Sequence, residues 1–106
     1  MSEPPRELFR HWIHSREEDA GGVTVYRPSI WDFPPARGRR GFEVKPDGGF
    51  VRYDIAPADG VRAVVGLWTI AGPGRVAVSF DDPRENYTLE ILACDATVLR
   101  VRILMT

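Results

Sequence analysis

The fold is decided by Val64-Val65-Gly66-Leu67-Trp68-Thr69-Ile70, which is followed by Ala71-Gly72-Pro73-Gly74 and then by Val76-Ala77-Val78-Ser79-Phe80. Side chains alternate between the two faces of a strand, so each apolar stretch places its large residues on one side. One face carries Val64, Gly66, Trp68 and Ile70, and the facing stretch carries Val76, Val78 and Phe80. The glycines and the proline between them are typical of a turn. The sequence therefore predicts two neighbouring antiparallel strands here.

The same alternation occurs on both sides of this hairpin, over residues 10–15, 23–26, 41–45, 50–55, 86–93 and 98–105. Pro46-Asp47-Gly48-Gly49 joins two of these stretches and is a strong turn signal. Consecutive strands joined by short turns are antiparallel neighbours. We therefore expect an all-β fold: an antiparallel meander of about eight strands closing into a small barrel, with at most a short N-terminal helical turn. Within strand 50–55, the pattern predicts Val51, Tyr53 and Ile55 on the inner face and Arg52 and Asp54 on the outer face.

The composition indicates one globular domain over residues 1–106, with 43% apolar and 27% charged residues. A net charge of −1 argues against nucleic acid as a partner, and the lack of a long apolar run argues against a membrane span. The N-terminus does not resemble a secretory signal, so we expect a cytoplasmic protein. Cys94 is the sole cysteine, which excludes an internal disulfide, and we expect it to be buried or half-buried. Nothing indicates a cofactor.

The least regular stretch is residues 27–40, where Pro34-Pro35 forbids a helix. Long loops in small domains are often functional. This one carries Ile30, Trp31 and Phe33, which are costly to leave in water. We therefore expect the loop to fold back and cover one end of the sheet.

Gly66-Leu67-Trp68 and the apolar alternation that continues to Leu99-x-Val101 are similar to those of small bacterial lipocalin-like proteins. The resemblance covers about residues 53–103 and implies a β-barrel with a ligand-sized pocket. Two features depart from lipocalins: the Gly-x-Trp lies mid-chain, and no helix follows the last strand.

We expect the protein to bind a small apolar or amphipathic molecule at the barrel end beneath the loop. Aromatic side chains supply contact area to such ligands, and arginines pair with anionic groups. The candidate ligand-binding residues are Tyr26, Trp31, Phe33, Tyr53 and His14, with Arg37 or Arg39 facing an anionic group.

Four alternatives stay open. His14 beside Glu17-Glu18-Asp19 is a candidate base or metal ligand, although such a polar turn is more often solvated, and we expect no metal. The loop arginines Arg27, Arg37, Arg39 and Arg40 are more simply explained by pairing with that acidic turn than by an anion site.

A small cyclase or isomerase would use His14 or Tyr53 as proton donor. A homodimer would use an outer apolar strip of Leu92, Val98 and Leu104.

Overall fold

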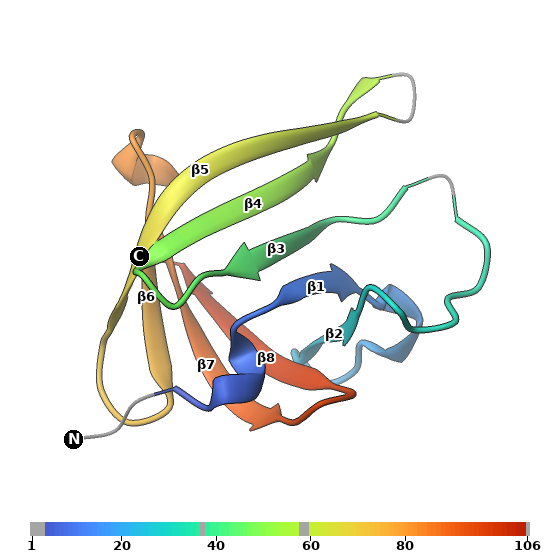
Figure 1. Cartoon of the computed structure of the whole chain (residues 1–106), viewed down its shortest axis with the longest axis horizontal. Coiled ribbons are helices and arrows are strands. Elements are labelled where there is room, and N and C mark those ends of the chain that lie inside the picture. Colours follow the sequence, from blue (N-terminus) through green and yellow to red (C-terminus); the bar gives the residue numbers. More distant parts are fainter. Residues whose placement is uncertain (1–3, 37, 58–59, 106) are drawn as a thin grey trace.

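The computed structural model describes residues 4–36, 38–57 and 60–105. Its strands are β1 (His11–His14), β2 (Thr24–Pro28), β3 (Gly41–Val44), β4 (Gly49–Ile55), β5 (Val61–Ile70), β6 (Arg75–Ser79), β7 (Tyr87–Cys94) and β8 (Leu99–Met105) (Figure 1). The described helical segments are short 3-10 turns: η1 (Arg6–Leu8), η2 (Arg16–Glu18) and η4 (Pro83–Glu85). The predicted all-β fold is confirmed.

The strands form one closed barrel in the order β1-β2-β8-β7-β6-β5-β4-β3, and every neighbouring pair is antiparallel. From β3 to β8 the chain is a simple meander, as the short turns predict. The first two strands depart from it, because β1 lies between β2 and β3 while β2 pairs with β8. Strands β2 and β3 therefore follow each other in the chain but do not pair in the barrel.

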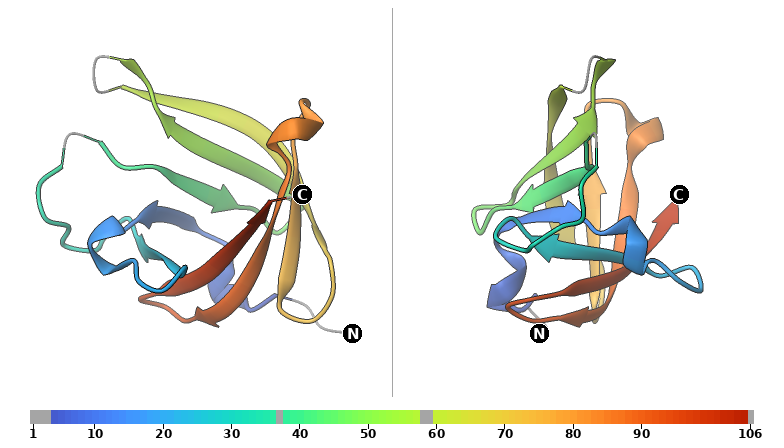
Figure 2. Two further views of the ribbon diagram at one scale, coloured as in Figure 1. Left: turned by 180° about the vertical axis from the view of Figure 1, so that it is seen from behind. Right: turned by 90° about the vertical axis from the view of Figure 1, so that its right-hand side faces the viewer.

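This strand order explains the irregular stretch. Strands β2 and β3 run in the same direction, since both are antiparallel to β1, so the chain must return along the length of β1 before β3 begins. At the start of the connection Trp31 N–H donates to the Pro28 carbonyl at 2.9 Å, and at its end His14 N–H donates to the Arg40 carbonyl at 2.8 Å. The described part of the connection swings out on the same side as the β4–β5 hairpin (Figures 1 and 2).

The β3–β4 hairpin forms at the predicted turn, where the Asp47 carboxylate accepts from Gly49 N–H at 2.9 Å and Gly48 has φ 96°. The predicted faces of β4 are wrong. Phe50 is fully buried in the barrel, and alternation places Arg52 and Asp54 on the same inner side. The ring of Tyr53 instead lies against His11, with centroids 4.6 Å apart, and its hydroxyl donates to Glu43. The apolar alternation predicts the wrong faces here because Arg52 and Asp54 make the inner wall of the barrel polar near the end of β4.

The faces of β5 and β6 agree with the sequence. Gly66 is buried beside Phe80, and Val76 and Val78 are buried in the core. A Cβ at Gly66 would lie 2.8 Å from the Phe80 ring, so the glycine lets this ring approach the strand. Trp68 is only half-buried, and its indole N–H donates to the Lys45 carbonyl at 2.7 Å.

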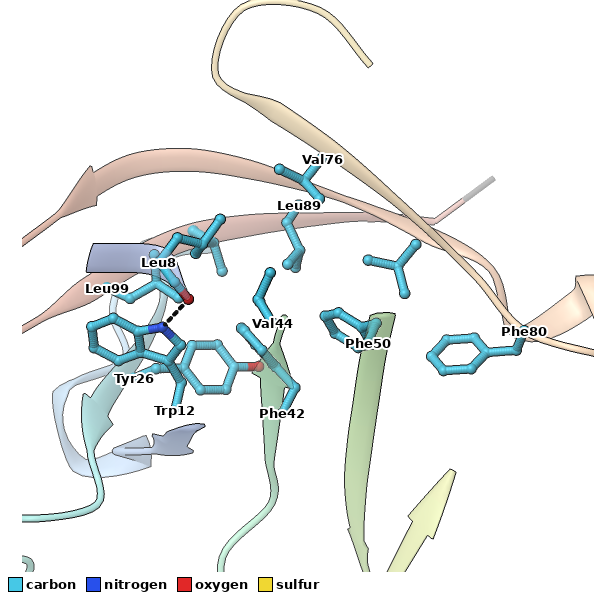
Figure 3. Packing of buried hydrophobic residues seen from close by; sticks show 12 residues of the cluster. Leu8, Trp12, Tyr26, Phe42, Val44, Phe50, Val76, Phe80, Leu89 and Leu99 are labelled. Carbon is cyan, nitrogen blue, oxygen red and sulfur yellow. Dashed lines mark hydrogen bonds between the residues drawn. The ribbon is translucent and has the colours of Figure 1, made fainter. Parts of the chain in front are cut away.

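One end of the barrel is plugged by the N-terminal segment. Leu8 from η1 and Trp12 from β1 are fully buried, and the Trp12 indole N–H donates to the Leu8 carbonyl at 3.0 Å. Figure 3 shows Leu8, Trp12 and Leu99 together at one side of the buried cluster, with Phe50 and Phe80 at the other. We call the barrel end that Leu8 and Trp12 plug the closed end. Cys94 packs against this cluster and is half-buried, which raises its thiol pKa to about 11.

The predicted outer apolar strip is not formed as expected. Val98 is buried, because it lies in the turn before β8, where Asp95 accepts from its backbone N–H at 3.0 Å. Leu92 is exposed beside a register shift between Ile91 and Ala93. Since Val98 is buried and Leu104 is half-buried, Leu92 alone of the three is exposed, and a homodimer stays a prediction.

Candidate functional site

The opposite end of the barrel, here called the open end, holds a cavity of about 580 Å³. Residues of β2, β3, β4, β5, β7 and β8, of the 29–40 connection and of η4 surround it. They are Tyr26, Arg40, Gly41, Phe42, Arg52, Tyr53, Asp54, Ile55, Arg62, Arg84, Glu85, Tyr87, Ile103 and Met105. The cavity forms where the β4–β5 hairpin extends beyond its neighbours, so that the barrel wall is uneven at this end (Figure 1).

Aromatic rings form the floor of the cavity. The Tyr26 and Phe42 rings lie 4.6 Å apart between centroids, and Phe42 stacks on the fully buried Phe50 at 5.2 Å. Tyr87 meets Phe50 at 6.3 Å in an edge-on arrangement. Offset and edge-on aromatic contacts of this kind are favourable beyond the area that they bury. The floor is therefore a mostly apolar surface of aromatic rings that pack against one another.

The two floor tyrosines keep their protons. Burial raises the pKa of Tyr26, with the charge of Asp19 adding to the effect, and burial likewise raises the pKa of Tyr87. Both hydroxyls are therefore neutral at any ordinary pH and can donate or accept a hydrogen bond. Within the described parts of the chain, neither hydroxyl has a side-chain or backbone partner. They are polar groups that a ligand can use.

One wall of the cavity is charged. Arg52 donates from Nε and Nη2 to the two Asp54 oxygens at 2.9 Å each, and from Nη2 to Glu85 at 2.8 Å. Its guanidinium lies over the Phe80 ring, 4.6 Å from the centroid. Burial alone would lower the pKa of Arg52, but the hydrogen bonds to Asp54 and Glu85 outweigh it and raise the pKa. Arg52 is therefore a fixed cation at the cavity.

The remaining lining residues divide the cavity into two sides. Arg40, Arg52, Arg62 and Arg84 line it together with Asp54 and Glu85, so arginines outnumber carboxylates. The apolar side chains Ile103 and Met105 come from β8. An elongated molecule can therefore place an apolar body on the floor and the β8 side while a polar group faces the arginines.

The structure brings only part of the predicted site together. Tyr26 lines the cavity, and Tyr53 borders it with a ring that is stacked on His11. Trp31 and Phe33 do not line it: Arg27 stacks on Trp31 at 3.9 Å, and Arg39 stacks on Phe33 at 4.7 Å. Ile30 is 90% exposed, so the loop does not bury its apolar residues over the barrel end as expected. Arg37 lies outside the described residues.

The loop arginines pair with the acidic turn, which confirms the simpler interpretation for Arg27 and Arg39. Arg39 makes two hydrogen bonds to Glu17, at 2.9 and 2.7 Å, and these lower the pKa of Glu17 to about 2. Arg27 likewise makes two bonds to Glu18, at 2.8 and 2.6 Å, and lowers the pKa of Glu18 to about 2. Arg39 is thereby committed to the scaffold rather than to the cavity.

His14 lies in the wall of a smaller pocket of about 230 Å³, which shares Arg40 and Ile55 with the main cavity. Its Nε2 lies 2.7 Å from the Asp19 carboxylate, and Asp19 also accepts from Val25 N–H. Glu17 and Glu18 are engaged by arginines, so the acidic turn does not gather around His14. Catalysis through His14 stays a prediction.

Sequence reasoning missed Arg52, Asp54 and Tyr87 as cavity residues. The available signal was Phe50, which begins the same alternation as Arg52 and Asp54 and is too large and apolar for the outer face. Reading β4 from Phe50 rather than from Val51 would have placed the ion pair inside.

Comparison with protein-family models, with curated proteins and with solved structures gives no match for this chain. No helix among the described residues is long and apolar enough to cross a membrane. Within the same residues, no three His, Cys, Asp or Glu side chains gather in the way that a metal ion requires. The site must therefore be interpreted from its own geometry.

Proposed function

We propose that the protein binds a small apolar or amphipathic molecule at the open end of the barrel. The observation that carries this proposal is the cavity of about 580 Å³ with an aromatic floor, an apolar β8 side and a charged β4 side. Ligand sites are commonly concave and mostly apolar, with a few fixed polar groups that orient the ligand. The floor rings, the Tyr26 and Tyr87 hydroxyls and Arg52 fit that description.

This site differs from the one expected from sequence in what surrounds the ligand. Tyr26 keeps its predicted role in this proposal, and Arg52 is the cation that faces the ligand, because Arg39 pairs with Glu17 instead. Trp31 and Phe33 act instead as stacking partners of Arg27 and Arg39.

The test uses N-phenyl-1-naphthylamine, a neutral apolar dye whose fluorescence rises in apolar surroundings. We expect saturable binding to the whole chain. Ile103→Gln places a polar group in the β8 side of the cavity and should weaken binding about three- to tenfold, because apolar contact area is lost.

Leu92→Gln is the matched control, since Leu92 is 43% exposed and Ile103 39%, and Leu92 does not line the cavity. It should leave dye binding unchanged. Absence of saturable binding, or equal losses in the two variants, would reject the proposal.

A further inference from the structure

Arg52 presents one edge of its guanidinium to a permanent partner. Asp54 accepts from Nε and from Nη2, both at 2.9 Å, and lies two residues away on the same face of the same strand. Phe80 supports the flat face of the group at 4.6 Å. Position and orientation of the guanidinium are therefore set by residues that cannot move away while the barrel is intact.

The second partner of Arg52 is held much more loosely. Glu85 accepts a single hydrogen bond, from Nη2 at 2.8 Å, and its side chain is 44% exposed, against 23% for Asp54. Glu85 belongs to η4, a single 3-10 turn in the β6–β7 connection, where the described residues show no other side-chain bond to Glu85. Nη1 of Arg52 has no partner among the described residues. Nη1 and Nη2 therefore form a donor pair that is only half used.

Resting on the proposed function, we infer that the Nη1–Nη2 edge of Arg52 is a carboxylate subsite, which Glu85 occupies in the free protein and which the carboxylate of an amphipathic ligand takes over. The two N–H groups along one edge of a guanidinium match the two oxygens of a carboxylate. Glu85 uses one of them, whereas a ligand carboxylate can use both. The exchange replaces one carboxylate with another, so the charge around Arg52 is conserved.

At the Arg52 edge itself, the neighbouring Asp54 carboxylate favours a ligand group with a single negative charge over a phosphate monoester. Asp54 faces the same guanidinium, and it also lies 3.5 Å from the Arg62 guanidinium. A second negative charge on the ligand would meet Asp54 at close range, and like charges at that distance repel. A monoanion avoids this cost, while its apolar part rests on the Phe42 and Tyr26 rings.

The exchange also predicts a local change in η4. Release of Glu85 removes the Arg52 contact of this turn and leaves the Asp82 cap on Arg84 N–H, at 3.0 Å. Arg84 itself lines the cavity. The backbone around residues 84–85 should therefore respond to an acid but not to a neutral ligand of the same shape.

The experiment compares 4-phenylbutyrate with 4-phenylbutyramide as competitors of bound N-phenyl-1-naphthylamine. The two have the same apolar part and differ in charge. In the wild-type protein the acid should displace the dye at lower concentration than the amide. Glu85→Gln should raise the ratio of acid affinity to amide affinity about two- to fivefold, the range expected for losing a half-exposed competing carboxylate.

Glu90→Gln is the matched control. Glu90 is also a partly exposed carboxylate, paired with Arg75 and Arg102 on the outer surface, and its removal changes the net charge by the same amount. It should not alter acid binding. Arg52→Lys keeps the charge but loses the forked donor pair, so the ratio of acid affinity to amide affinity should fall.

The outcomes separate the two proposals. If the dye and the amide bind but Glu85→Gln and Glu90→Gln give the same acid affinity, the carboxylate subsite is wrong and the proposed cavity stands. If no probe binds the wild-type protein, both are wrong. Amide ¹H–¹⁵N shifts at Arg84 and Glu85 on addition of the acid, and not of the amide, would confirm the exchange; equal shifts with both would contradict it.

Discussion

The two ends of this barrel have the same backbone pattern and opposite interiors. At the closed end the inward residues are apolar and fully buried, as Leu8, Trp12 and Leu99 are. At the open end the inward residues include Arg52 and Asp54, and a cavity of about 580 Å³ remains. Strand pairing closes the barrel, but the side chains that each strand turns inward decide whether an end is packed or hollow.

The difference assigns separate tasks to the two ends. Close packing of large apolar side chains contributes most of the stability that a small domain can gain. A cavity lined by charged groups contributes little to stability, but it offers fixed donors and acceptors to a ligand. We therefore expect substitutions at the closed end to affect folding and those at the open end to affect binding.

The largest expected effect comes from Trp12→Ala. The indole is fully buried, and its N–H bonds to the Leu8 carbonyl, so its removal leaves a void and takes away one of the two hydrogen bonds that this carbonyl accepts, the other coming from Arg10 N–H. The free energy of unfolding should fall by about 3–5 kcal/mol. Urea denaturation followed by far-UV circular dichroism measures this loss.

Met105→Ala is the control at the open end, where the side chain is 67% exposed, and it should change the free energy of unfolding by less than about 0.5 kcal/mol. Similar losses in the two variants would show that the ends do not differ as described.

A smaller effect is expected at Gly41, the first residue of β3, which pairs with Ile13 of β1 and lines the open-end cavity. A Cβ at this position would overlap the Trp12 carbonyl oxygen, which is backbone and cannot turn aside. Gly41→Ala should therefore lower the free energy of unfolding by about 1–3 kcal/mol, the usual cost of forcing extra atoms into a packed site.

Gly38→Ala provides the comparison in the same denaturation experiment, because its Cβ would lie 3.6 Å from the Ile55 side chain, an ordinary contact. Equal stability of the Gly41 variant and the wild type would mean that β1 and β3 are not paired as closely as described.

The smallest effect concerns pH and the acidic turn beside the open end. Hydrogen bonds from Arg39 and Arg27 lower the pKa values of Glu17 and Glu18 from 4.5 to about 2 in the folded protein. The stabilising contribution of a lowered carboxyl pKa is complete above the unfolded value of 4.5 and is lost as the pH falls toward 2. The urea midpoint should therefore decrease in this window.

The double variant Glu17→Gln, Glu18→Gln should have a lower midpoint at neutral pH and a flatter profile between pH 4.5 and 2, measured by urea titrations at several pH values. A profile as steep as that of the wild type would place the responsible carboxylates elsewhere in the chain.

The sequence predicts the strands well because the alternation of apolar and polar residues along a strand depends only on neighbouring positions in the chain. The inner faces of β6 and β8 follow directly from Val76, Val78, Leu99 and Val101. The same alternation predicts the wrong faces for β4. There Arg52 and Asp54 point inward and form a polar cavity wall, whereas polar residues are expected on the outer face. The position of β1 between β2 and β3 depends on long-range pairing, and alternation carries no information on which strand is the partner.

The candidate site was harder to predict than the fold, because its residues come together only through contacts between distant parts of the chain. Aromatic residues on the loop suggested a cover, but stacking on Arg27 and Arg39 holds Trp31 and Phe33 beside the barrel instead. The cavity residues come from six different strands, and only the closed barrel brings Tyr26, Arg52 and Ile103 together.

The most direct test of the two-ended account is a ¹H–¹⁵N spectrum of the protein titrated with N-phenyl-1-naphthylamine. We expect amide shifts at Phe42, Tyr87 and Ile103 around the cavity, with Leu8 and Leu99 unchanged at the closed end. Shifts centred on Trp31 and Phe33, or on the closed end, would contradict it.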